Sequence, residues 1–152
     1  MGDRTALQPD VLEFLFTQEA QQALVELGAA RLDEAGAMSA LFALRKRFPA
    51  PEAGALLSLA QARAQAVGKF PDAAKLYFTP EAVEQATTKA VAAHHAAWLD
   101  RCAPPGVVLD LGCGIGGDLI ALARTRRVIA YELDPVRVRF AEANLAVVGL
   151  AD

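Results

Sequence analysis

The chain has 152 residues, of which 54% are hydrophobic and 22% charged, with a net charge of −3 and a pI of about 5.4. This composition is typical of a globular protein and excludes a disordered one. No apolar run reaches the roughly 18–20 residues of a membrane span, and residues 1–5 lack the features of a signal peptide. The acidic balance gives no overall electrostatic footprint for nucleic acid. Cys102 and Cys113 form no disulfide framework, so we expect a cytoplasmic protein.

The first hundred residues are rich in alanine and carry apolar residues at helical spacing, which predicts an almost entirely helical region. We expect helices over 10–15, 17–28, 36–47, 51–68 and 79–99. Asp10, Thr17 and Thr79 are candidate N-caps, because their side-chain oxygens can accept a hydrogen bond from the first helical turn. Pro51 and Pro80 fit the beginning of a helix, where a missing backbone N–H does no harm.

The helix expected over 36–47 has an apolar stripe and a basic end. Its apolar side chains, which we expect to pack together, are Met38, Leu41, Phe42 and Leu44. Arg45-Lys46-Arg47 would lie in the last turn, where the helix dipole favours positive charge. A solvated helix end explains this triplet better than an RNA contact does.

No metal site is expected. His94 and His95 are adjacent in the sequence, so on a helix their side chains point about 100° apart and do not bind one ion from one face. No Cys, Asp or Glu lies nearby at the spacing of a metal ligand.

After Gly106 the pattern changes from helical to alternating strand and helix. We expect a buried strand over 107–111, a helix over 118–125, a strand over 128–132 and a helix that Asp134 caps, through Val148. This β-α-β-α order predicts a parallel sheet with a right-handed crossover. Two parallel strands do not bury both faces of a sheet. We therefore expect a truncated α/β domain, which could self-associate through its uncovered sheet.

A glycine-dense turn follows the first of these strands. Gly112, Gly114 and Gly117 satisfy the dinucleotide pattern G-x-G-x-x-G, and Glu132 lies 20 residues after the first glycine, where a ribose-binding acid is expected. Asp110, however, lies at the end of the strand, two residues before the first glycine. An acid there would repel a pyrophosphate and would suit a ligand with positively charged groups.

The pattern Asp110-x-Gly112-x-Gly114-x-Gly116 resembles the cofactor motif of class I methyltransferases, whose fold is Rossmann-like and whose cofactor is S-adenosylmethionine. This resemblance implies that Leu111 and the three glycines border the cofactor. It also implies that Glu132 accepts hydrogen bonds from both ribose hydroxyls and that Leu133 flanks the adenine. The chain would then consist of an all-helical region, 1–103, and the first half of a cofactor-binding domain, 104–152.

A closer resemblance includes the segments before the turn. Phe78-Thr79-Pro80-Glu81, together with the turn and Glu132-Leu-Asp-Pro135, is similar to the trimethylguanosine synthase type of methyltransferase. Gly68-Lys69-Phe70 and Glu84-Gln85-Ala86-Thr87 resemble a bacterial group of methyltransferases with a C-terminal THUMP-like domain. The resemblance implies that Thr79 borders the cofactor pocket and that the methyl acceptor is the exocyclic amine of a guanine in RNA.

The catalytic segment of that family, an Asn- or Asp-Pro-Pro turn after the fourth strand, has no counterpart in this sequence. No catalytic residue is therefore assigned, RNA would bind through regions that this chain lacks, and the chain alone is expected to be inactive. Two other functions stay open. One is an NAD-dependent oxidoreductase that uses G-x-G-x-x-G, and the other is a non-catalytic helical interaction module.

Overall fold

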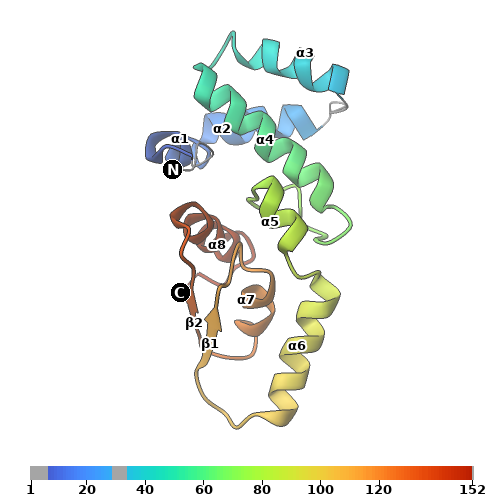
Figure 1. Cartoon of the computed structure of the whole chain (residues 1–152), viewed down its shortest axis with the longest axis vertical. Coiled ribbons are helices and arrows are strands. Elements are labelled where there is room, and N and C mark those ends of the chain that lie inside the picture. The colour runs from blue at the N-terminus through green and yellow to red at the C-terminus, as the bar shows by residue number, and fades with distance from the viewer. Residues whose placement is uncertain (1–6, 29–33, 152) are drawn as a thin grey trace, which may run out of the picture.

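The computed structural model of the chain describes residues 7–28 and 34–151. The elements in chain order are α1 (Pro9–Phe14), α2 (Gln18–Gly28), α3 (Glu34–Leu44), α4 (Ala50–Ala66), α5 (Pro80–Gln85), α6 (Lys89–Cys102), β1 (Val108–Leu111), α7 (Gly117–Leu122), β2 (Val128–Tyr131) and α8 (Pro135–Val147). Helices α1 to α5 gather at one end of an elongated molecule, and the strands with α6 and α7 form the other end (Figure 1). None of the described helices combines the length and apolar character needed to cross a membrane.

Helix α4 is the centre of the helical region, because α1, α2, α3 and α5 all pack against it. Small and branched apolar side chains on α4 make these contacts, and the fully or nearly fully buried ones are Ala53, Leu56, Leu59, Ala60, Ala62 and Ala66. Short alanine side chains let neighbouring helices approach α4 closely. The expected helical region is thus confirmed for the described residues.

Three of the four predicted N-caps are confirmed. The side chains of Thr17, Thr79 and Asp134 accept hydrogen bonds of 3.2, 3.1 and 2.8 Å from backbone N–H groups two or three residues later. Asp10 does not cap α1, so that prediction is wrong. Gln8 holds the N-cap position without a side-chain bond, and Asp10 lies in the first turn, where the helix dipole still favours its negative charge.

The stripe predicted on α3 is only partly buried. Leu44 is buried, whereas Met38 and Phe42 are 57% and 69% exposed, because only one side of α3 faces α4. Helix α3 also ends at Leu44, before the predicted position, so the triplet Arg45–Arg47 forms a turn after the helix.

Helices α5 and α6 replace the single helix predicted over 79–99, so that prediction is wrong. The break between them spans 86–88. Thr88 ends the break as the N-cap of α6. Its hydroxyl oxygen accepts a hydrogen bond of 3.4 Å from the Val91 N–H. Helix α6 then continues to Cys102, three residues beyond the predicted end.

Lys69 stabilises the end of α5 at this break. Its ammonium group donates hydrogen bonds to the carbonyl oxygens of Val83, Glu84 and Ala86, at 2.7, 2.8 and 3.2 Å. The last carbonyl groups of a helix have no partner within the helix, and positive charge is favoured beside them. Lys69 thus supplies the partners that a continued helix would have supplied.

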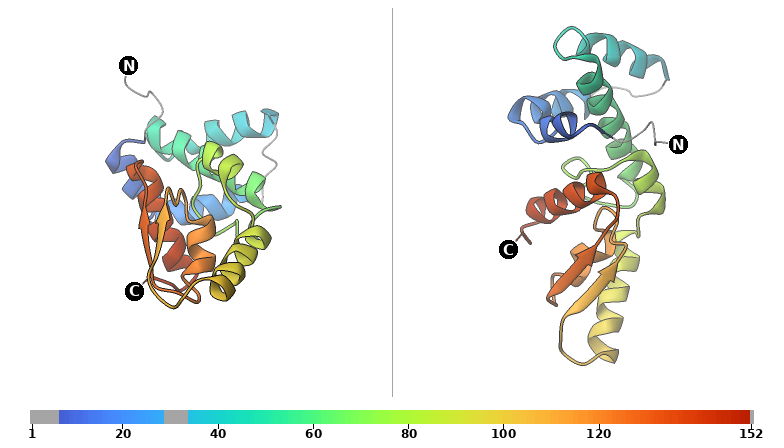
Figure 2. Two further views of the ribbon diagram at one scale, coloured as in Figure 1. Left: turned by 60° about the horizontal axis from the view of Figure 1, so that its bottom comes forward. Right: turned by 60° about the vertical axis from the view of Figure 1, so that its left-hand side comes forward.

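The two strands are parallel, as predicted, and lie in register from Val108 opposite Val128 to Leu111 opposite Tyr131. They begin and end within one residue of the predicted positions, whereas α7 ends at Leu122, three residues early. Helix α7 contacts both strands and packs against α6 (Figure 2). The structure is therefore a helix-rich fold with a small parallel sheet, compatible with part of an α/β methyltransferase fold.

One face of this sheet is uncovered among the described residues. Leu109 and Leu111 of β1 are 58% and 74% exposed, and Ile129 and Tyr131, their register partners on β2, are 43% and 58% exposed. The prediction that the first strand is buried is thus wrong for this face. Parallel sheets are normally covered on both faces, and here helices pack on one. Self-association through this face stays a prediction.

The helical region and the α/β part share one hydrophobic core. Tyr77 and Phe140 of α8 lie with their ring centroids 5.8 Å apart. Beside them the fully buried side chain of Asn144 accepts a hydrogen bond of 2.7 Å from the Tyr77 N–H, and donates 3.0 Å bonds to the carbonyls of Tyr77 and Ile115. Asn144 therefore joins the segment before α5, the glycine turn and α8.

We expect Asn144→Leu to lower the free energy of unfolding by about 2–4 kcal/mol, because it removes three hydrogen bonds and leaves buried backbone groups without partners. Urea unfolding followed by circular dichroism measures this change. Glu142→Leu, which introduces the same side chain at an exposed position of α8, is the control, with an expected change below about 0.5 kcal/mol. Equal effects of the two substitutions would contradict this role of Asn144.

Candidate functional site

The turn between β1 and α7 depends on its glycines for its shape. Gly112, Gly114 and Gly116 have φ angles of 87°, 58° and 92°, in the left-handed region that favours glycine. A Cβ atom added at Gly112 or Gly114 would meet no heavy atom within 4 Å. The turn therefore needs glycine for its backbone conformation, and it leaves open space beside the backbone, where a ligand can approach.

Asp110 lies beside this open space with an unsatisfied charge. Its Oδ2 atom is buried and has no hydrogen-bond partner among the described residues. Burial raises the pKa of Asp110 above its usual range, and the negative charge of Asp118 raises it further. A buried carboxylate oxygen without a partner is costly in free energy. A positively charged or hydrogen-bond-donating ligand would remove that cost.

Glu132 connects the end of β2 to the glycine turn. Its carboxylate accepts hydrogen bonds from the backbone N–H groups of Gly114 at 2.9 Å, Leu133 at 2.7 Å and Asp134 at 3.0 Å. The bond from Asp134, supported by the other two, lowers the pKa of Glu132. Glu132 is therefore an anion at neutral pH and fixes the position of Gly114.

The break between α5 and α6 brings a second group of polar residues to the turn. The hydroxyl of Thr87 donates a 2.6 Å hydrogen bond to Oδ2 of Asp118, in the first turn of α7, and His95 Nδ1 lies 2.8 Å from Oδ1 of the same residue. A Cβ at Gly117 would lie 3.1 Å from the Thr87 carbonyl oxygen, so glycine permits this close approach. The sequence alone predicted no role in this site for Thr87, His95 or Asp118. The Gly116-Gly117 pair before an acid was the signal that could have indicated them.

Cys113 lies within the turn but is not a reactive thiol. Burial, together with the negative charges of Asp110 and Glu132, raises the pKa of Cys113 to about 11. The thiolate is the nucleophilic form of cysteine. The Cys113 side chain is therefore neutral at physiological pH.

A cavity of about 130 Å³ lies between the turn, the first residues of α7, and α5 with the break that follows it. Of the predicted site residues it brings together Asp110, Gly112 and Gly114, and the other residues on its lining are Ala82, Gln85, Ala86, Thr87, Cys113, Ile115, Gly117, Asp118 and Arg137. Pockets for ligands of nucleoside size are typically about 300–1,000 Å³. The described residues therefore enclose only part of such a ligand.

The remaining predicted residues lie outside this cavity. Gly116 is buried at the N-cap of α7, and Leu111 lies on the exposed face of the sheet. Leu133 follows Glu132 and is fully exposed, with no neighbour covering it among the described residues. Thr79 caps α5 and lines a separate cavity of about 160 Å³, which includes none of the glycines of the turn.

No protein-family model matches the sequence, and no solved structure matches it. Two curated proteins of Mycobacterium tuberculosis, from strains CDC 1551 and H37Rv, are each 42% identical to this chain over 74 residues. Both are named uncharacterized S-adenosylmethionine-dependent methyltransferases. The matched residues are 48% of this chain and 20% of each relative, so the chain spans about a fifth of the length of the curated relatives it matches. This similarity supports the methyltransferase family that the motifs indicate.

Proposed function

We propose that this chain holds the cofactor-binding turn of an S-adenosylmethionine-dependent methyltransferase. The observation that carries the proposal is the buried Oδ2 atom of Asp110, which has no partner among the described residues and lines the cavity of the glycine turn. S-adenosylmethionine carries an ammonium and a sulfonium group, and a carboxylate near them is favourable. The names of the two relatives support the same cofactor.

Glu132 would bind the ribose of this cofactor. A carboxylate has roughly four lone-pair positions for hydrogen bonds, and backbone N–H groups occupy three of them. Oε2, which accepts only the Gly114 N–H, can accept one ribose hydroxyl in the observed conformation. Binding of both hydroxyls, as the resemblance implies, would require the release of one N–H group.

When bound, S-adenosylmethionine would supply an activated methyl group, whose bond to the positively charged sulfur breaks as a nucleophile bonds to the methyl carbon. The residues of this chain contribute binding and orientation to that reaction. The turn would admit the cofactor beside its backbone, Asp110 would offset positive charge, and the Thr87–Asp118 bond holds the break between α5 and α6 against the first turn of α7. We propose that this chain, by itself, binds the cofactor but does not transfer the methyl group.

We further propose the trimethylguanosine synthase type for the whole protein, with the exocyclic amine of a guanine in RNA as methyl acceptor, and kinship with the group that has a THUMP-like domain. The support for the synthase type is the resemblance of 78–81, 110–118 and 132–135. The support for the kinship is the resemblance of 68–70 and 84–87. The segments 68–70 and 84–87 are in contact in the structure: Lys69 donates hydrogen bonds to the carbonyl oxygens of Glu84 and Ala86.

Calorimetric titration tests the cofactor. We expect S-adenosylhomocysteine, the demethylated product, to bind the whole protein and NAD not to bind, because Asp110 disfavours a pyrophosphate beside the turn. The same titrations of the 152-residue chain should give weaker binding of S-adenosylhomocysteine, since the described residues enclose only part of the ligand. Selective binding of NAD would support the oxidoreductase instead. Binding of neither compound to the whole protein would support the interaction module.

Asp110→Asn tests the residue that carries the proposal. Because its pKa is raised in the folded chain, ionised Asp110 favours the unfolded state, and this loss of stability develops as the pH rises through the folded-state pKa. We therefore expect Asp110→Asn to keep or raise the thermal midpoint at pH 7 while weakening S-adenosylhomocysteine binding about tenfold or more. A lower midpoint with unchanged affinity would mean that Asp110 has only a structural role.

Gly114→Val tests the position of the ligand. The substitution fills open space beside the turn, so we expect binding of S-adenosylhomocysteine to be lost while the helical circular dichroism signal stays. Gly149→Val is a matched control, because Gly149 also has a positive φ angle, 74°, and open space around a Cβ, but it lies off the cavity lining. Equal binding by the two variants would place the ligand elsewhere.

A further inference from the structure

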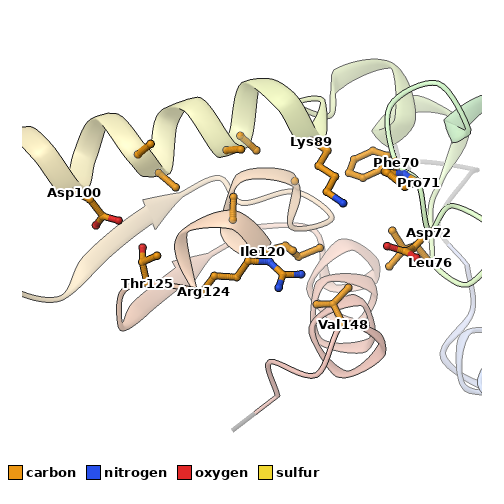
Figure 3. A pocket seen from close by; sticks show the side chains of 16 residues that line it. Phe70, Pro71, Asp72, Leu76, Lys89, Asp100, Ile120, Arg124, Thr125 and Val148 are labelled. Atoms are coloured by element: carbon orange, nitrogen blue, oxygen red, sulfur yellow. The ribbon is translucent and has the colours of Figure 1, made fainter.

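A second cavity, of about 320 Å³, lies between α6, α7 and the segment 70–76 (Figure 3). It shares only Gly117 with the lining of the cavity at the glycine turn. Asp110, Glu132 and the three glycines of the turn with positive φ angles do not line it. Its chemistry can therefore be considered separately from cofactor binding.

The lining of this second cavity is largely apolar. Ala92 and Ala96 lie one turn apart on the same side of α6, and Ile120 and Ala121 of α7 face them. Phe70 extends the apolar surface from the segment before α5. Helices α6 and α7 pack directly against each other, and Ala92 and Ala96 are almost fully buried. The hollow therefore lies beside this helix pair, where its apolar lining suits an apolar body such as an aromatic ring.

The rim of the second cavity carries two cations. Lys89, at the start of α6, and Arg124, just after α7, both extend toward the hollow (Figure 3). Within residues 7–28 and 34–151, neither side chain has a hydrogen bond or an ion pair. Two cations without partners on one rim favour an anion between them.

The acidic residues on the lining do not cancel this charge. Asp100 forms an ion pair with Arg126, at 2.6 Å, so its charge is already matched. Asp72 is the other carboxylate on the lining, and it pairs with neither cation in the part of the chain that the structure describes. The cavity thus keeps an excess of positive charge at its rim.

We propose that this second cavity binds a small aromatic anion, a phosphate or a carboxylate, whose ring lies on the apolar lining that α6, α7 and Phe70 form together. Lys89 and Arg124 would bind the anionic group. The cavity volume is at the low end of the range for ligand pockets, which suits a body of one or two rings. The site is a binding site only, and its ligand undergoes no reaction there.

The test uses 1-naphthyl phosphate, whose own fluorescence reports binding, with the 152-residue chain. We expect saturable binding that excess S-adenosylhomocysteine does not reduce. Lys89→Gln and Arg124→Gln should each weaken binding about three- to fivefold, as for exposed charge pairs, and the double variant about tenfold or more. Arg45→Gln and Lys46→Gln, which remove cations outside the cavity lining, should leave the affinity unchanged. Circular dichroism checks that all variants are folded.

Two further probes separate the ring from the charge. 1-Naphthol, which lacks the anion, and inorganic phosphate, which lacks the ring, should each bind at least tenfold more weakly. Equal binding of either compound, unchanged affinity of the double variant, or no binding of the probe would overturn the proposal. Displacement of the probe by S-adenosylhomocysteine would also overturn it, by placing the probe at the glycine turn, and would leave the cofactor proposal intact.

Discussion

The three hydrogen bonds from the Lys69 ammonium group to the end of α5 determine how the helical region meets the glycine turn. They provide partners for carbonyl groups that would otherwise favour a continued helix. The chain can then change direction at 86–88, and Thr87 reaches Asp118 in the first turn of α7. Without this break, the residues of α6 would extend away from the turn, and the cavity beside Asp110 would lack one wall.

A common core makes the helical region part of the site. Composition changes near residue 104, where an almost purely helical sequence gives way to strands. Packing does not follow this change, because buried residues from α1 and α4 belong to the same apolar cluster as Ile115, Val136 and Phe140. Asn144 then fixes the relation of this core to the turn through hydrogen bonds to Tyr77 and Ile115. Changes in the helices can therefore alter the geometry of the turn.

The sequence predicted those features whose cause lies within a few residues. Thr17, Thr79 and Asp134 cap helices through bonds that span two or three positions, and the left-handed glycines follow from the conformation that the turn requires. Asp110 was recognised from its spacing to the first glycine. Its buried, unpaired oxygen needed the structure.

The features that the sequence did not predict depend on distant partners. The alanines on both sides of 86–88 favour a continuous helix, and Thr88 is a local N-cap for α6. The break also depends on Lys69 and Asp118, which lie far along the chain in opposite directions. The exposure of Phe42 and Leu109 was likewise not predicted, because it depends on which distant elements pack against them. Apolar periodicity indicates which side chains could be buried, whereas burial depends on which element packs against them.

The raised pKa of Cys113 has a consequence for the chemical durability of the proposed site. A thiolate beside a methyl sulfonium would be an efficient methyl acceptor, and the protein would alkylate itself. With a pKa of about 11, the Cys113 side chain of the chain alone is almost entirely protonated at pH 7. The acids that we propose hold the cofactor, Asp110 and Glu132, are also those whose charges help to keep this sulfur protonated. The same two side chains would thus attract the methyl donor and protect the turn from it.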